Sequence, residues 1–247
     1  MHRNRLIPSA ALSAVLVMVV FLLAPLPAMA FQLTPMSAVL DPSGSLPTAT
    51  FEISNSAATP VAVQLRAVTR SILPDGTELN EDASQQLQVF PSQVILRPGL
   101  SQTIRVRWVG GEPPTRELPF RLVAEQLPVN LQRNQEAGSG LQFMLRYRAT
   151  LYVRPPGTTP RVEVERLEVD RQENVLILEV ANRGTRHQPF SSGYLILTGD
   201  TPEQQVNLET LEPFVTVNVL PGERRRVVVP LELLPVIPRE VRFRFDR

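Results

Sequence analysis

The sequence predicts an all-β protein of two immunoglobulin-like β-sandwich domains joined by a proline-rich elbow. Apolar and polar residues alternate with a period of two in many short segments, as in strands that bury one face. Turn-forming residues separate these segments, and 24 prolines in 247 residues leave little room for helices. The strand pattern stops at RPPGTTP, residues 154–160, and then starts again, so we expect a linker there.

The first 30 residues have the layout of a secretory signal peptide. A basic start is followed by an apolar run over residues 10–26 and by the tripeptide AMA at residues 28–30, which matches an A-x-A cleavage site. Two prolines interrupt the run, and no later apolar run approaches the ~20 residues of a membrane span. We therefore expect cleavage after Ala30 and no stable membrane insertion afterwards, with an uncleaved anchor as the alternative.

The composition excludes several classes of function. Cleavage would leave 217 residues with 23 Arg against 24 acidic residues, a balance that does not favour nucleic-acid binding. The absence of Cys excludes disulfides and zinc–thiolate sites. A periplasmic hydrolase would depend on His187, the one histidine of the mature chain, which stands in a polar turn that we expect to be solvated. We predict a protein that is not an enzyme, with no catalytic residue, cofactor or metal site.

Residues 31–153 are expected to form the first domain. Turn sequences such as DPSG at residues 41–44 and PDG at residues 74–76 divide this region into strands. Residues 76–86 are polar and are expected to form a loop or a weak edge. About seven strands in about 120 residues is typical of an immunoglobulin-like sandwich. The expected strands are residues 32–40, 48–53, 61–72, 89–96, 101–108, 120–127 and 141–153.

Residues 161–247 are expected to form the second domain, a smaller sandwich. The alternation is weaker here, and Pro221-Gly222 marks a corner. Two sandwiches on a short elbow would give a bent molecule with a cleft between them. The expected strands are residues 161–169, 175–180, 194–198, 206–211, 215–220, 224–229 and 241–245.

The last expected strand of the first domain, LQFMLRYRATLYV at residues 141–153, is unusually long. At about 3.3 Å per residue it would run about 43 Å, against about 5–6 residues for an ordinary strand. Either its whole apolar face packs into the core of its own domain, or another chain covers part of it. The residues of that face are Leu141, Phe143, Leu145, Tyr147, Ala149, Leu151 and Val153.

Two arginines alternate with the apolar residues of this strand, just before the elbow. Arg146 and Arg148 either form a solvated outer face or act as a cationic clamp in the cleft. A guanidinium group is well shaped to bind a carboxylate, which makes the second interpretation chemically reasonable.

Taken together, these features resemble the periplasmic chaperones of chaperone–usher pilus assembly, the PapD-like family. Residues 31–55 are similar to the first two strands of that family, and residues 90–106 to its proline-containing strand and corner. Glu117, followed eleven residues later by Pro128, matches the spacing of the family's signature segment. LYVRP at residues 151–155 is similar to the end of the last strand of its first domain.

The resemblance implies a periplasmic chaperone that donates a strand to a pilin-like subunit and delivers it to an outer-membrane usher. Leu141, Phe143 and Leu145 would fill the groove of the subunit, next to Tyr147, Arg146 and Arg148. Self-association could cover the strand in the free protein. The alternative is a secreted two-domain adhesion or scaffold module whose long strand completes its own sheet.

The resemblance also implies an interdomain ion pair between Glu117 and Arg154, and it shows departures. Two basic residues that anchor the terminal carboxylate of the subunit in the family align with Ser37 and Thr150, which carry no charge. The signature segment differs at Leu118, Pro119 and Arg121. We expect Arg148, which shares a strand face with Thr150, to take over the anchor.

Overall fold

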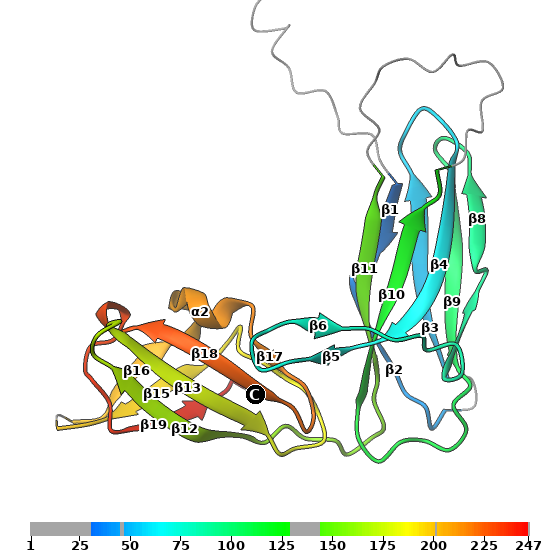
Figure 1. The fold of residues 1–247 in the computed structure, drawn as a ribbon. Helices are drawn as coiled ribbons and strands as arrows, with labels where there is room; N and C mark the ends of the chain where they lie inside the picture. The colour runs from blue at the N-terminus through cyan, green and yellow to red at the C-terminus, as the bar shows by residue number, and fades with distance from the viewer. Residues whose placement is uncertain (1–30, 45–46, 129–143, 201, 247) are drawn as a thin grey trace, which may run out of the picture.

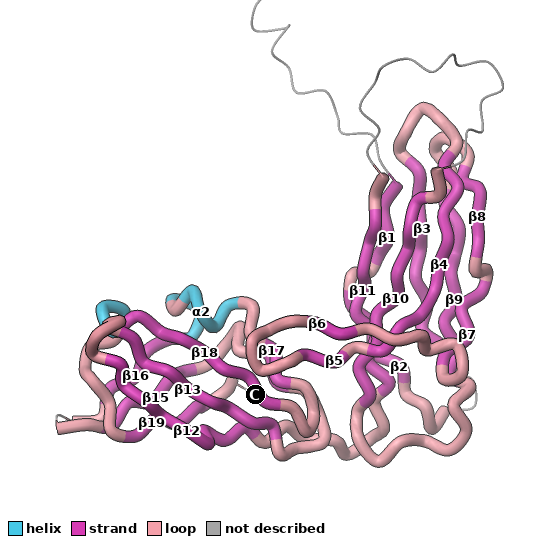
Figure 2. Tube along the Cα trace, viewed as in Figure 1, coloured by secondary structure: helices cyan, strands magenta, loops and turns pink. Residues whose placement is uncertain are grey.

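The computed structural model describes residues 31–44, 47–128, 144–200 and 202–246, and these residues form two β-sandwiches in a bent molecule (Figure 1). Strands and loops make up almost all of it, with short helical turns confined to the second sandwich (Figure 2). The predicted signal peptide lies outside the described residues. Among the described residues, no helix is long and apolar enough to cross a membrane.

The first sandwich packs a four-stranded sheet, ordered β1-β3-β9-β7, against a five-stranded sheet, ordered β2-β11-β10-β4-β8. All pairs are antiparallel except that of β2 with β11, which is parallel. The strands are β1 (Phe31–Thr34), β2 (Ser37–Leu40), β3 (Thr48–Asn55), β4 (Val61–Thr69), β7 (Leu87–Phe90), β8 (Gln93–Leu96), β9 (Ser101–Trp108), β10 (Leu118–Gln126) and β11 (Arg146–Val153).

The period-two pattern explains why these segments pair and pack. Along β3, alternate residues are buried, so Phe51 and Ile53 enter the space between the sheets while Glu52 stays in solvent. Burying a side chain of this size contributes about 1.5–3 kcal/mol. Ile104 and Val106 of β9 and Leu122 of β10 fill the same core.

Prolines split two of the expected strands. Residues 32–40 are not one strand, because Pro35 lies between β1, which pairs with β3, and β2, which pairs with β11 in the other sheet. Residues 89–96 likewise divide at Pro91 into β7 and β8, which belong to different sheets. Proline has no N–H to donate to a strand ladder, so strand pairing stops at Pro35 and at Pro91. After each proline the next strand joins the other sheet.

The expected strand over residues 61–72 also divides, and the expected loop after it contains a strand. Residues beyond β4 form a two-stranded hairpin of β5 (Ser71–Ile72) and β6 (Glu78–Leu79). In Figure 1 this hairpin extends from the first sandwich to the second. It places polar residues that looked like a solvated loop at the junction of the two sandwiches.

The expected strand over residues 141–153 begins at Arg146 in the described part of the chain, where Met144 and Leu145 carry no strand assignment. Pairing with β10 nevertheless reaches one residue further, because Gln126 N donates to Leu145 O at 2.9 Å. Residues 141–143 lie outside the described residues.

The second sandwich packs the sheet β12-β13-β18 against the sheet β16-β15-β19, with β14 and β17 as a separate pair. Residues 206–211 and 215–220 are not strands throughout, because a 3-10 turn (Leu208–Thr210) and the helix α2 (Glu212–Val215) interrupt them. The strands are β12 (Val162–Asp170), β13 (Val175–Asn182), β14 (Gln188–Pro189), β15 (Tyr194–Thr198), β16 (Gln204–Asn207), β17 (Asn218–Val219), β18 (Arg224–Pro230) and β19 (Glu240–Arg244).

Each sandwich has its own core and its own buried asparagine. Phe190 and Phe214 lie at the centre of the second core, with ring centroids 5.8 Å apart. Asn55 ends β3 and Asn182 ends β13, and both are almost fully buried. Their side-chain amides satisfy backbone groups of the adjoining turns, which would otherwise be buried without partners.

Candidate functional site

One edge of β11 is unpaired over half of its length. Residues 146–153 pair with β10 on one side, but on the other side β2 pairs only with Thr150 to Val153. No strand among the described residues pairs with that side of residues 146–149. Unpaired N–H and C=O groups of such an edge can hydrogen-bond to an added strand.

The odd-numbered residues of β11 face the interior of the first sandwich. Ala149, Leu151 and Val153 are buried, whereas Tyr147, near the open end, is half-buried. The Tyr147 ring contacts the Phe31 ring edge-on, with centroids 5.0 Å apart. Leu145 is also half-buried and packs against the same core. The predicted subunit-binding residues Leu141 and Phe143 lie outside the described residues.

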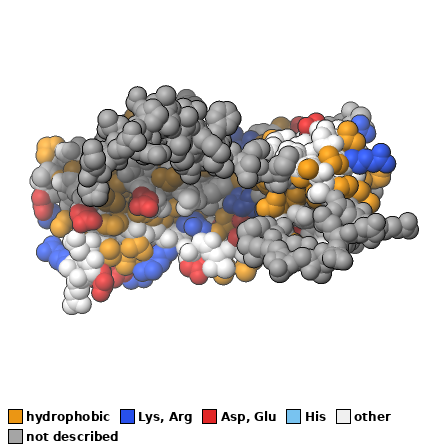
Figure 3. Space-filling view, turned by 90° about the horizontal axis from the view of Figure 1, so that it is seen from above, with side chains coloured by type: hydrophobic (Ala, Val, Ile, Leu, Met, Phe, Trp, Pro, Cys, Tyr) orange, Lys and Arg blue, Asp and Glu red, His pale blue; other side chains and the backbone are white. Residues whose placement is uncertain are grey.

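Hydrophobic side chains are also exposed on the first sandwich. Seen from above in Figure 3, they lie at its surface, on the right of the view, with arginines beside them. Met144, next to Leu145, is 63 % exposed.

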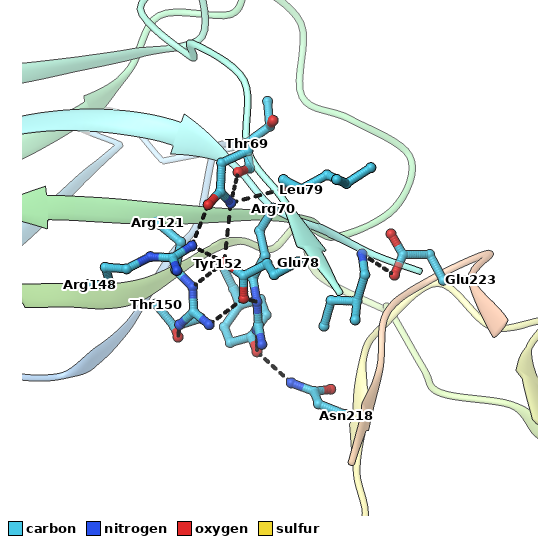
Figure 4. A network of polar contacts seen from close by, with 12 residues as sticks. Thr69, Arg70, Glu78, Leu79, Arg121, Arg148, Thr150, Tyr152, Asn218 and Glu223 are labelled. Atoms are coloured by element: carbon cyan, nitrogen blue, oxygen red, sulfur yellow. Dashed lines mark hydrogen bonds and ion pairs between the residues drawn. The ribbon is translucent and has the colours of Figure 1, made fainter. Parts of the chain in front are cut away.

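The two predicted cleft arginines have different surroundings. Arg146 is exposed and forms an ion pair with Glu125 of β10. Arg148 reaches the hairpin, where its Nη2 donates to Glu78 Oε1 at 2.6 Å and to the side-chain oxygen of Asn80. Arg148 therefore takes part in a polar network at the junction rather than standing alone on an outer face (Figure 4).

Glu78 is the centre of this network. Its carboxylate accepts hydrogen bonds from Arg70 Nε at 3.0 Å and from Arg121 Nε and Nη2 at 3.0 and 2.6 Å. Burial alone would raise the pKa of Glu78, but hydrogen bonds from Arg121 and Asn80 outweigh it and lower the pKa to about 2. The carboxylate is therefore ionised throughout the physiological range.

Ser37 and Thr150, the two positions at which the resemblance led us to look for basic residues, lie side by side. Ser37 of β2 and Thr150 of β11 are paired residues in the parallel ladder, directly beyond the open edge. Arg121 of β10 is paired with Thr150 on its other side and donates a hydrogen bond to the Thr150 hydroxyl. A positive charge is thus supplied next to Thr150 by the neighbouring strand.

A buried ion pair joins the two sandwiches. Glu117, whose side chain is completely buried, accepts a hydrogen bond from Arg154 Nε at 2.5 Å. His187 of the second sandwich adds its backbone N–H at 3.0 Å and ring Nδ1 at 2.5 Å. Burial alone would raise the pKa of Glu117, but the contacts with His187 and Arg154 lower it overall. The expectation of a solvated His187 is wrong, since its ring also stacks on Tyr152 at 3.9 Å between centroids.

The hairpin forms a second link between the sandwiches. Ile72 N donates to the Glu223 carboxylate at 3.0 Å, and Arg226 N donates to Pro74 O at 2.7 Å. Burial raises the pKa of Glu223, with hydrogen bonds from Ser71 and Ile72 acting in the opposite direction. The Tyr152 hydroxyl accepts from Asn218 at 2.9 Å, as Figure 4 shows. These contacts tie the orientation of the second sandwich to the position of Glu78.

The family is decided by comparison with known proteins. The sequence model described as pili and flagellar-assembly chaperone, PapD N-terminal domain, matches residues 33–159. The chain belongs to this family. It is a divergent PapD-like chaperone, and its general role is that of a pilus-assembly chaperone in a family of non-enzymatic proteins. A search of curated proteins finds no match.

Solved structures show the same two-sandwich fold. The class 5 fimbriae chaperone CfaA has 14 % identity and a TM-score of 0.59, and the match covers 88 % of this chain and 92 % of CfaA. The YadV chaperone has 15 % identity and a TM-score of 0.55, with 88 % and 92 % covered. A third match is the CsuC–CsuE chaperone–tip adhesion subunit pre-assembly complex, from archaic chaperone-usher Csu pili of Acinetobacter baumannii. Its identity is 14 % and its TM-score 0.53, and the match covers 79 % of this chain and 88 % of the matched chain.

Several residues of this site could not be found by sequence reasoning. Glu78 lies in a segment that was expected to be a polar loop, and Arg121 was noted only as a departure from the signature segment. Glu78 is 43 residues from Arg121 and 70 residues from Arg148 in the sequence, so no local pattern links them. The single histidine next to Arg186 gave no sign of its contact with Glu117.

Proposed function

We propose that this chaperone binds a pilin-like subunit by donor-strand complementation along β11. The observation that carries the proposal is the open edge over residues 146–149, which ends where β2 begins to pair at Thr150. A strand of the subunit would hydrogen-bond to this edge and continue the line of β2. The neighbouring structures that contain a chaperone with a tip adhesion subunit support a subunit as the partner.

Apolar side chains at alternate positions would supply the affinity. Leu141, Phe143 and Leu145 would enter the groove of the subunit, and Tyr147 would border it. Each such burial contributes about 1.5–3 kcal/mol, so three could offset much of the ~4–15 kcal/mol that association costs. Because Leu145 and Tyr147 already contact the core of the first sandwich, they would make that core continuous with the core of the subunit.

Arg148 would anchor the terminal carboxylate of the subunit, with Arg146 beside it. A strand that fills the edge up to residue 149 must end there, because β2 occupies the edge from Thr150 onward. If this strand runs parallel to β11, as β2 does, its carboxyl end comes to the arginines. Ser37 and Thr150 would contribute hydroxyl groups rather than charge.

We further propose that residues 1–30 are a signal peptide, that the chaperone works in the periplasm, and that it delivers its subunit to an outer-membrane usher. Residues 31–153 and 161–247 would be its two domains, linked by residues 154–160, with the Glu117–Arg154 pair fixing the elbow between them. In the absence of a subunit, two molecules would cover their open edges by self-association.

A substitution on the donated strand tests the proposal. The Phe143→Glu variant should fold, by circular dichroism, but should no longer co-purify with a subunit identified by mass spectrometry of periplasmic extracts. Met144→Glu is the matched control, because Met144 has the opposite parity and is exposed, so it should retain the subunit. Unfolding of Phe143→Glu, or subunit capture equal to that of Met144→Glu, would contradict strand donation.

A further inference from the structure

The cluster around Glu78 contains more positive than negative charge. Three guanidinium groups, from Arg70, Arg121 and Arg148, contact one carboxylate. Arg121 holds that carboxylate through two nitrogen atoms, which is the geometry of a specific carboxylate site. The side chains of Arg70, Arg121 and Glu78 are only 10–17 % exposed. Arg70 and Arg121 are thus already removed from most of their water.

Arg148 is the most exposed of the three arginines in the cluster. Arg148 is 42 % exposed and, with Asn80, lines a surface hollow of about 460 Å³ over β4, β10 and β11. The charged residues around this hollow are three arginines, Arg66, Arg146 and Arg148, and two acids, Glu81 and Asp82. Two buried residues, Val68 and Val123, also line the hollow. A carboxylate from outside would therefore reach Arg148 first, and it would reach the less exposed Arg121 only by taking the place of Glu78.

The cluster also stands where the open edge of β11 stops. Arg148 lies on the unpaired part of the strand, and Thr150, which accepts a hydrogen bond from Arg121, is the first residue paired with β2. Glu78 is not part of this sheet. It comes from the hairpin β5–β6, whose strands have two residues each and whose tip is attached to β18 of the second sandwich.

We propose that Arg121 and Arg148 form a carboxylate-binding site in which Glu78 is an internal ligand, and that a peptide carboxylate binds by exchange with Glu78. The inference rests on the proposed strand addition. It adds that Glu78, a residue of the chaperone itself, competes with the peptide carboxylate for the two arginines. Exchange leaves the number of charges in the site unchanged, so little new desolvation is required. Since the pKa of Glu78 is about 2, it leaves the site through exchange rather than through protonation.

Exchange would also connect binding to the second sandwich. Release of Glu78 would remove the side-chain contact between β6 and the arginines of β10 and β11, while hydrogen bonds between Thr69 and Glu81 keep the segment on β4 and the tip of the hairpin remains hydrogen-bonded to β18. The internal ligand would favour partners that end in a free carboxylate next to a strand. A strand without one would pair with the edge but would not displace Glu78.

The test compares two peptides on the full mature protein. The probe is a short peptide of alternating valine and threonine, prepared with a free C-terminal carboxylate and as the C-terminal amide, and binding is measured by calorimetry. Glu78→Gln should bind the free-acid peptide about tenfold more tightly than the parent, the ratio expected for one charge-assisted hydrogen bond. The amide peptide should bind both proteins equally, which also reports that the edge of β11 is intact.

Glu165→Gln is the matched control, because Glu165 is held by Arg183 and Arg224 on the second sandwich, away from the cluster. It should leave both affinities unchanged. If both peptides bind and Glu78→Gln does not favour the free acid, the exchange is refuted and strand addition stands. If neither peptide binds the parent or the variant, strand addition is refuted and the exchange falls with it.

Discussion

Replacing Glu117 by glutamine removes the negative charge at the junction of the two sandwiches while preserving the shape of the side chain. In the parent, a completely buried carboxylate faces Arg154 at 2.5 Å and His187 at 2.5 and 3.0 Å. The variant leaves the Arg154 guanidinium without its anion, although that group is 28 % exposed and keeps some water.

The expected loss of unfolding free energy is roughly 2–3 kcal/mol. It falls within the ~1.5–3 kcal/mol of a hydrogen bond to a charged group and below the ~3–5 kcal/mol of a fully buried pair broken on one side, because Arg154 is 28 % exposed. For a chain of this size the loss corresponds to a fall in Tm of about 5–10 °C. Urea denaturation followed by tryptophan fluorescence and far-UV circular dichroism measures it.

The pH dependence supplies an independent check on the Glu117 prediction. Because the folded-state pKa of Glu117 is lowered from 4.5, its stabilisation is complete above pH 4.5 and is lost as the pH falls through the folded value. The difference between parent and Glu117→Gln should therefore shrink below pH 4.5. The exposed pair of Arg161 and Glu163 provides the control, since Glu163→Gln should cost less than ~1 kcal/mol. Equal losses in both variants would refute the reasoning.

Three further predictions concern other parts of the chain. The pKa of about 2 for Glu78 means that its stabilisation, complete above pH 4.5, is lost between pH 4.5 and 2, so in urea titrations the parent should lose more stability over that range than Glu78→Gln. Asn182→Ala should cost about 3 kcal/mol or more, because it leaves four backbone groups without the partners that Asn182 supplies at 2.7–3.1 Å. Gly184→Ala should cost about 1–3 kcal/mol in thermal melts, because an added Cβ would lie 2.4 Å from Arg161 N and Thr159 O.

Two of these predictions have a matched variant. Asn182→Asp keeps an accepting oxygen but places a buried carboxylate oxygen against the Arg186 and Val219 carbonyls, so it should cost at least as much as Asn182→Ala. Gly44→Ala should be nearly neutral, because the nearest atom to its added Cβ is 3.9 Å away. A pH profile of Glu78→Gln that matches the parent below pH 4.5 would contradict the role assigned to Glu78.

The sequence was sufficient for the fold class because each strand needs only its local alternation to show which face is buried. The sequence was insufficient where contacts between distant segments decide which sheet a strand joins. Pro35 and Pro91 lie within segments whose apolar pattern continues across them, so the change of sheet at each was not visible. At residues 212–215 the short helix has no period long enough to detect.

The candidate site was predictable only in part. Strand parity placed Arg148 and Thr150 on one face, and family resemblance paired Glu117 with Arg154, which lie in contact. Glu78 lies in the hairpin β5–β6 and His187 in a turn of the second sandwich, and the paths of both segments depend on contacts between the two sandwiches. Such contacts leave no periodic trace in the chain.

The point at which the chain passes from one sheet to the other, at Pro35, sets the length of the open edge of β11. Every residue by which β2 lengthens toward its start would occupy one more position on β11 and deny it to an incoming strand. Moving this proline by two residues would therefore lengthen or shorten the open edge of β11 by two residues, which is one repeat of the side-chain pattern. The position of a single proline thus sets how many residues of an added strand can pair with β11.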